Sequence, residues 1–169
     1  RAQALLRGAG FGAALDGCRG LDHGAWSPLL HMYPEAEVPV VQVSVQPALG
    51  PRHHAQLGRA LRPLAAEGVL LVGSGHLTHN LRDWARAHGV PAPYAREFQQ
   101  WVKARLEGHD LDGLADYRTR AAHGARAHPT EEHFLPLFFA LGAAGDAPRP
   151  ERIYDGVDGV LAMDAYVFQ

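Results

Sequence analysis

What this sequence has little of already excludes several classes of protein. Cys18 is the only cysteine among 169 residues, so the chain cannot form an internal disulfide and needs no oxidising compartment. No apolar run approaches the roughly 20 residues of a membrane-spanning helix, and the N-terminal stretch lacks the apolar core of a signal peptide. We therefore expect a cytoplasmic protein with no membrane partner.

Long runs of like charge are also absent. The 16 Lys and Arg residues nearly balance the 18 Asp and Glu residues. A nucleic-acid-binding surface needs a concentration of positive charge, so no nucleic-acid partner is expected. The length suits one domain, and neither an internal repeat nor a linker divides the chain. We predict that residues 1–169 all belong to a single domain.

Histidine, in contrast, is abundant. The eleven copies are scattered along the chain, as in a fold that brings some of them together, and do not form a tract. Imidazole is the commonest metal ligand in proteins and titrates near neutral pH, so this abundance favours metal or acid–base chemistry. The HExxH motif and paired carboxylate motifs are absent, which disfavours a metallohydrolase.

The hydrophobic pattern predicts an α/β fold in which helices cover a sheet. β-Branched residues predict a strand over 38–45, helical periodicity follows over 51–67, and a second apolar strand is predicted over 69–72. This order favours a parallel pair of strands. The remaining expected elements are helices over 1–7, 81–88, 94–106, within 108–128 and over 131–141, short strands over 11–15 and 159–168, and a loop over 20–26.

The segment GSGHLTHN, residues 73–80, is the first candidate for chemistry. It follows a predicted strand, and loops at the carboxyl ends of parallel strands often hold ligands. His76 and His79 therefore stand at a favourable position, although an ordinary strand-to-loop turn explains the segment equally well.

Two further segments carry histidines. In LDHGAW, residues 21–26, Asp22 could orient His23 and Trp26 could form the wall of a site for an aromatic ligand; a loop histidine with local hydrogen bonds is the alternative. In HPTEEHFLPL, residues 128–137, His133 lies on an apolar helix, where a metal or a buried hydrogen bond would satisfy it. Glu131 and Glu132 suit the positive end of that helix.

Taken in this order, these segments resemble the class III extradiol ring-cleavage dioxygenases, the LigB-like superfamily, and most closely its DOPA 4,5-dioxygenase-like branch. The resemblance is carried by residues 21–45, 57–84 and 128–143, followed by LAMDAYVF near the end of the chain. It implies an α/β domain with a mixed central sheet flanked by helices. It also implies a mononuclear metal site that uses Fe²⁺ for activity and can carry Zn²⁺ in the isolated protein. Two metal-binding histidine segments of family members have no counterpart here, so the expectation is the C-terminal portion of a LigB-like domain whose N-terminal part is missing.

The resemblance also implies roles for individual residues. His133 matches a metal ligand. His79 matches the acid–base histidine, which is sometimes treated as a further metal ligand. His23 matches a histidine that faces the substrate, and Asn80 and Trp26 are assigned to the substrate side.

The function that follows is extradiol cleavage of a catechol ring of the DOPA or caffeate kind. The implied partners are the catecholic substrate and O₂, and a homo-oligomer is compatible with the sequence. The alternative is a LigB-like protein that binds metal or a partner without oxygen chemistry.

Overall fold

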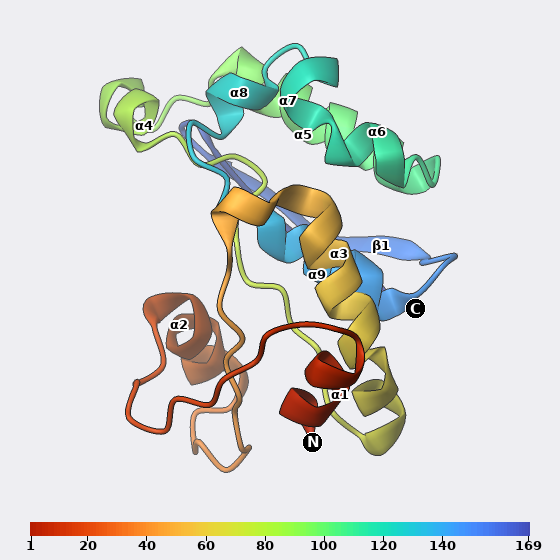
Figure 1. Cartoon of the computed structure of the whole chain (residues 1–169). Coiled ribbons are helices and arrows are strands. Elements are labelled where there is room, and N and C mark those ends of the chain that lie inside the picture. Colours follow the sequence, from red (N-terminus) through yellow and green to blue (C-terminus); the bar gives the residue numbers. More distant parts are fainter.

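The structure, a computed structural model, describes all 169 residues (Figure 1). It contains nine α-helices, two 3-10 helices and one sheet of two strands. In chain order the elements are α1 (Ala2–Gly8), α2 (His23–Met32), η1 (Pro47–Leu49), α3 (Gly50–Leu61), η2 (Arg62–Glu67), α4 (Leu81–Ala87), α5 (Pro93–Glu107), α6 (Leu111–Ala115), α7 (Tyr117–Arg120), α8 (Gly124–Ala127), α9 (Leu135–Ala144), β1 (Pro150–Asp158) and β2 (Leu161–Phe168). The α/β class expected from the sequence is confirmed.

Helices α3 and α9 pack at the centre of the molecule with their backbones in contact (Figure 1). A Cβ atom on Gly58 of α3 would overlap the carbonyl oxygen of Phe139, and one on Gly142 of α9 would overlap the carbonyl oxygen of Ala55. Each helix therefore brings a glycine to the backbone of the other, an approach that any larger side chain would prevent. Almost every residue of α9 is apolar, as is typical of a helix surrounded by other elements.

The largest group of buried apolar side chains lies where α5, α9 and β2 meet. Phe98, Val102 and Leu106 follow one face of α5 at four-residue spacing, as the periodicity predicts, and all three are buried. The full set of buried residues in this core is Leu77, Phe98, Val102, Leu106, Leu114, Tyr117, Ala121, Ala127, Phe134, Leu135, Phe138, Leu141 and Ala162. Leu77 connects this core to the segment GSGHLTHN.

The sheet is an antiparallel hairpin of β1 and β2, which reverses at Gly159 with a φ of 58°. The terminal strand predicted from the sequence is confirmed by β2. Strand β1 was not predicted, because its acidic residues and Gly156 obscure the alternation of apolar and polar positions and most of its side chains are exposed. Residues 155–158 also belong to β1.

The predicted parallel pair is wrong. No backbone hydrogen bond joins residues 38–45 to residues 69–72, and neither segment has strand structure; the short strand expected over 11–15 does not form either. One residue of each segment nevertheless contributes to a hydrophobic cluster: Val43 and Leu71 pack against the buried group Leu6, Leu57, Leu61 and Leu64. Most of the other apolar side chains of both segments are exposed, because a strand also requires a hydrogen-bonded partner and neither segment has one.

Three helix boundaries differ from expectation for identifiable reasons. Pro63 lies in the first turn of η2, so the long helix predicted over 51–67 changes to 3-10 geometry after Leu61. Pro136 lies in the first turn of α9, which begins at Leu135 rather than at Glu131. Residues 23–26, predicted as loop, form the first turn of α2, which follows Asp22.

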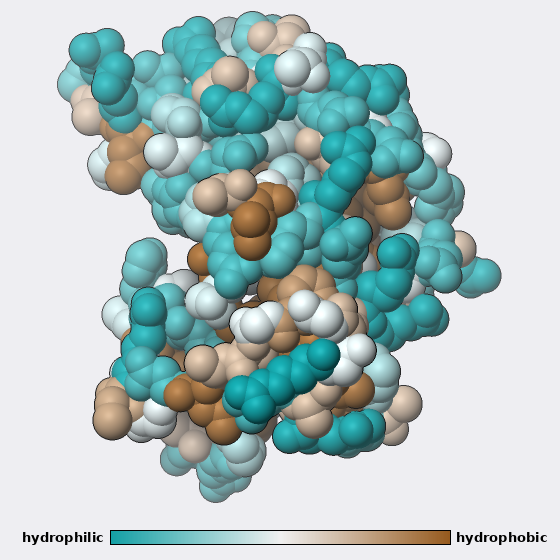
Figure 2. Space-filling model, viewed as in Figure 1, coloured by the Kyte–Doolittle hydropathy of each residue, from teal (hydrophilic) through white to brown (hydrophobic).

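Several large apolar side chains remain exposed, among them Val41 (75%), Leu70 (63%) and Leu30 (57%). Figure 2 shows hydrophobic surface on the lower half of this view, the half that contains α1 and α2 in Figure 1. None of the helices combines the length and the hydropathy needed to cross a membrane.

Candidate functional site

The segment GSGHLTHN runs from the extended chain after η2 to the start of α4 and is held along its length by other elements. Three of its backbone N–H groups donate to carbonyl oxygens elsewhere in the chain: His76 to His133 (2.8 Å), Leu77 to Ala162 (2.9 Å) and His79 to Ala127 (2.8 Å). The buried Thr78 hydroxyl donates to the carbonyl of Val160 and accepts from the N–H of Ala162, both at 2.6 Å. The histidines of this segment are therefore displayed from a fixed backbone.

The glycines of the segment allow it to lie directly against the residues before and within α9. A Cβ atom on Gly73 would overlap the carbonyl oxygen of Pro136, and one on Gly75 would overlap that of His133. Only residues without a side chain permit this approach. The close contact brings His79 and His133, which are 54 positions apart in the sequence, to one place.

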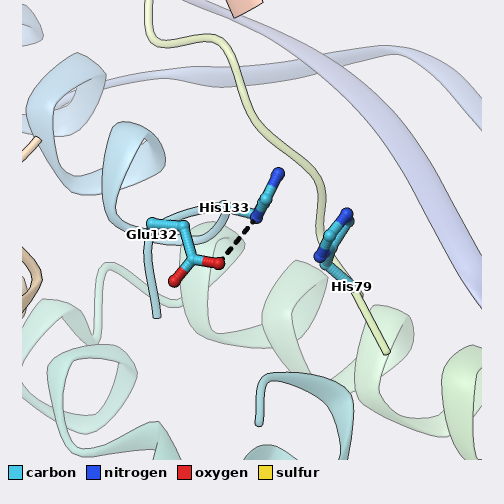
Figure 3. A group of neighbouring side chains, drawn as sticks. All are labelled: His79, Glu132 and His133. Atoms are coloured by element: carbon cyan, nitrogen blue, oxygen red, sulfur yellow. Dashed lines mark hydrogen bonds and ion pairs between the residues drawn. The ribbon is translucent and has the colours of Figure 1, made fainter. Parts of the chain in front are cut away.

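His79, Glu132 and His133 form a cluster in which one potential ligand atom from each residue lies within 4.8 Å of the others (Figure 3). The rings of His79 and His133 are stacked, with centroids 3.4 Å apart and planes inclined by 12°. Glu132 Oε1 lies 3.3 Å from His133 Nδ1. Two imidazoles and a carboxylate are the donor set of many non-haem iron sites and also suit zinc. The cluster therefore fits a divalent transition metal.

Glu132 is the member of this cluster that the sequence analysis missed. The helix-dipole explanation given for it was wrong, because α9 starts at Leu135 and its first turn contains no acidic residue. Instead, Thr130 Oγ1 donates to Glu132 Oε1 at 2.7 Å, while Glu131 accepts a hydrogen bond from the Tyr117 hydroxyl at 2.9 Å. The direct adjacency of Glu132 and His133 was the available signal.

The electrostatic environment keeps His79 neutral. Burial, followed by the nearby rings of His133 and His76, lowers the pKa of His79 to about 4. Removing a histidine from water penalises its charged form, and each neighbouring imidazole adds repulsion once it is protonated. At neutral pH the ring therefore has a free nitrogen lone pair, which can bind a metal or accept a proton.

His76 lies beside the cluster. Its ring centroid is 5.5 Å from that of His79 and 6.0 Å from that of His133. Burial is the main cause of its lowered pKa, and its Nδ1 atom is buried with no hydrogen-bond partner. The structure thus brings together the two histidines of GSGHLTHN with His133.

The other predicted site residues lie around this cluster or farther from it. Asn80 is buried: its side-chain oxygen accepts from the N–H of Asp83 (3.1 Å) at the start of α4, and its side-chain nitrogen donates to the carbonyl of Arg126 (2.9 Å). His23 and Trp26 are exposed in the first turn of α2, outside the cluster. The adjacent Gly24 faces the Ser74 hydroxyl, so this turn approaches GSGHLTHN.

Asp22 does not orient His23 as the sequence suggested. It forms a reciprocal pair with Gln42, donating its N–H to Gln42 Oε1 (3.0 Å) and accepting from Gln42 Nε2 (2.9 Å). Asp22 therefore connects the start of α2 to the extended segment 38–46.

An open pocket of about 410 Å³ begins at the metal-ligand cluster. Its lining residues are His79, Asn80, Leu81, Arg82, Asp83, Arg126, Pro129, Thr130 and Glu132. This volume is in the range of small-molecule sites, and the lining is polar except for Leu81 and Pro129. A candidate metal site and a candidate ligand pocket are thus continuous.

Comparison with known proteins identifies the family. Residues 2–163 match a family described as the catalytic LigB subunit of aromatic ring-opening dioxygenase. This chain belongs to the LigB family. The resemblance drawn from the three sequence segments is therefore confirmed, and similar proteins support its DOPA-dioxygenase branch.

Several relatives of this LigB-family chain are named 4,5-DOPA dioxygenase extradiol. The chain is 44% identical to that of Beta vulgaris and 48% identical to that of Portulaca grandiflora, in each case over 99% of its own length and 63% of the relative. Identity to that of Escherichia coli K12 is 41%, over 85% of the chain and 55% of the relative. The chain thus spans less than two thirds of the length of these relatives.

A solved structure supports the fold. The crystal structure of an uncharacterised protein from Escherichia coli K12 superposes with a TM-score of 0.84 at 34% sequence identity, covering 97% of this chain and 70% of that one. The arrangement of helices and hairpin seen here is therefore that of a LigB-like protein.

Proposed function

We propose that the protein to which this chain belongs is an extradiol dioxygenase. Such an enzyme breaks the ring bond beside the two hydroxyl-bearing carbons of a catechol, and both atoms of O₂ enter the ring-opened product. The observation that carries the proposal is the convergence of His79, Glu132 and His133 within 4.8 Å at the end of a ligand-sized pocket, in a chain of the LigB family. The relatives named for DOPA cleavage favour a catechol of the DOPA or caffeate kind.

The metal is assigned to His133 and Glu132; His79 adjoins them as the acid–base residue, and metal binding is its alternative role. Fe²⁺ is the proposed metal for activity, and Zn²⁺ suits the same ligands in the isolated protein. A bound Fe²⁺ would supply the site at which electron density passes from a catechol to dioxygen. Glu132 also offers its carboxylate to Nδ1 of His133, an arrangement that fixes the orientation of a metal-binding imidazole.

His79 is the proposed acid–base residue. Because its pKa is lowered to about 4, it is neutral at the pH of the cell and can accept the proton that a catechol hydroxyl loses on binding. The protonated ring then becomes a proton donor for the later bond cleavage. Its backbone, held by the carbonyl of Ala127, would keep the ring in position through both transfers.

Three residues are proposed on the substrate side. Asn80 orders the start of α4 and the chain at Arg126, and so shapes one wall of the pocket. His23 and Trp26 lie on a turn that approaches GSGHLTHN, from which they would face the ring of the substrate.

Anaerobic loading of the full-length protein with Fe²⁺, followed by catechols and air, tests this function. A yellow ring-opened product that incorporates two atoms of ¹⁸O from ¹⁸O₂ is expected. An Fe²⁺-loaded protein that binds catechols but forms no product from any of several would instead favour a LigB-like protein without oxygen chemistry.

A further inference from the structure

We infer that Arg126 binds a carboxylate on the side chain of the substrate and thereby selects anionic catechols over neutral ones. The inference rests on the proposed function, because it assigns part of the same pocket. Arg126 and His79 both line that pocket, which also contains Glu132. Arg126 therefore lines a ligand-sized space together with the candidate metal ligands, and it also lines a neighbouring pocket of about 420 Å³ beside Tyr94.

The backbone explains why Arg126 lies beside the cluster. The N–H of His79 donates to the carbonyl of Ala127, and the side chain of Asn80 donates to the carbonyl of Arg126. Two adjacent residues of GSGHLTHN are thus joined to two adjacent residues at the end of α8. Arg126 is held in a fixed relation to His79, as a residue that orients a substrate must be.

The side chain of Arg126 is oriented as well. Its Nε donates to Asp83 Oδ2 at 2.9 Å, and its guanidinium carbon lies 4.0 Å from the centre of the Tyr94 ring. Asp83 is itself positioned, because its N–H donates to the side chain of Asn80. The guanidinium is held at Nε and along one face before any ligand arrives, which lowers the entropy lost on binding.

This arrangement leaves the two terminal nitrogens of Arg126 available. The hydrogen bond to Asp83 uses Nε alone, and the side chain is 57% exposed. The pair of terminal N–H groups matches the two oxygens of a carboxylate, the strongest common mode of carboxylate recognition. Arg82 adds a second positive charge to the same pocket. Of the two carboxylates that line the pocket, Asp83 pairs with Arg126 Nε and Glu132 belongs to the metal-ligand cluster. The side of the pocket formed by Arg82 and Arg126 is therefore assigned to anion binding.

Two catechols that differ only in charge test the inference: 3-(3,4-dihydroxyphenyl)propanoate and its neutral amide. In the Fe²⁺-loaded full-length protein, Arg126→Gln should raise KM for the acid about tenfold, the effect of one charge-assisted pair, with kcat within about twofold. KM for the amide should change less than about twofold. Arg126→Lys keeps the positive charge but loses the paired N–H groups of the guanidinium. Its KM for the acid should lie between those of wild type and Arg126→Gln.

Two control variants distinguish carboxylate binding by Arg126 from a general effect of removing a positive charge near the pocket. Arg86→Gln alters a guanidinium of α4 that lines only the neighbouring cavity, and it should behave as wild type. Arg82→Gln removes the other cation of the same pocket. If Arg82→Gln produces the acid-specific loss and Arg126→Gln does not, or if Arg126→Gln affects acid and amide equally, the assignment to Arg126 is overturned.

A binding measurement tests this inference independently of the proposed dioxygenase function. Metal-free protein is titrated calorimetrically with 3-phenylpropanoate, which has the carboxylate but no hydroxyl groups. Wild type should bind it at least about fivefold more tightly than Arg126→Gln, and equal affinities would overturn the inference. Absence of turnover in wild type would contradict the dioxygenase function alone, since this titration requires no chemistry.

Discussion

The imidazole rings of His79 and His133 lie face to face, 3.4 Å between centroids and 12° between planes. Burial is the main cause of the low pKa of His79, and the repulsion that would arise if both stacked rings were charged is the second. His79 is thus neutral at neutral pH, the form in which histidine binds metals.

Substitution of each ring should separate their roles. His133→Ala is expected to remove most of the bound metal, whereas His79→Ala should abolish turnover and retain most of it, because His79 is assigned to proton transfer. Metal content is measured by mass spectrometry beside ring-opening activity. Equal loss of metal in both variants would make His79 a ligand instead.

Glu132 should matter for metal binding, whereas the adjacent Glu131 should not. Glu132→Gln removes the carboxylate beside His133 and is expected to weaken metal affinity by about 10- to 100-fold. Glu131→Gln is a matched control, because Glu131 accepts its hydrogen bond from Tyr117. Competition with a coloured chelator measures both affinities, and equal values for the two variants would remove Glu132 from the site.

Gly142 should tolerate no side chain. Gly142→Ala would drive a methyl group into the carbonyl of Ala55, and the resulting overpacking is expected to lower the free energy of unfolding by at least about 1–3 kcal/mol. Gly24→Ala, also in a helix, has its nearest neighbours at 3.4 and 3.8 Å and should be neutral or stabilising by up to about 1 kcal/mol. Urea unfolding of both variants makes the comparison; equal destabilisation would contradict the backbone contact.

Acid should destabilise the fold through His128. Burial beside Phe98, Tyr117 and Phe134 lowers the pKa of His128 to about 3, against the opposing effect of its hydrogen bond to the carbonyl of Leu77. Because the unfolded chain takes up this proton at about pH 6.5 and the folded chain does not, the stability is present above that pH and falls as the pH is lowered towards 3.

The loss attributable to His128 should approach about 1.4 kcal/mol per pH unit within that interval. His128→Gln removes the titrating group and keeps a donor for Leu77, so its unfolding free energy should depend less steeply on pH. Urea titrations at pH 7, 6, 5 and 4 provide the slopes. Parallel curves for wild type and variant would show that His128 does not contribute.

The sequence predicted well wherever the decisive interaction is local. The amphipathic pattern of α5 and the apolar and aromatic residues of β2 formed the expected elements, since each depends on side chains a few positions apart. The segments 38–45 and 69–72 have equally suitable composition, but strand formation depends on a distant partner that composition does not specify.

In the candidate site, too, local signals were readable from the sequence and long-range contacts were not. His79 and His133 were recognised from the motifs around them, and the structure brings them together. Glu132 was assigned to a helix end because the boundary of α9 was placed four residues too early. Arg126 had no motif at all: its place beside His79 depends on two hydrogen bonds between residues 46 and 48 positions apart, which only the folded chain reveals.

The reciprocal glycine contact between α3 and α9 has a consequence for motion. Helices that meet through side chains can slide as rotamers change, but Gly58 and Gly142 place backbone against backbone, where no rotamer is available to absorb a displacement. The two helices should move as one rigid body. Any adjustment that admits a substrate would then fall to the turn at residues 128–134 and to the side chains of the pocket, so amide exchange in α3 and α9 should be slow and insensitive to ligand.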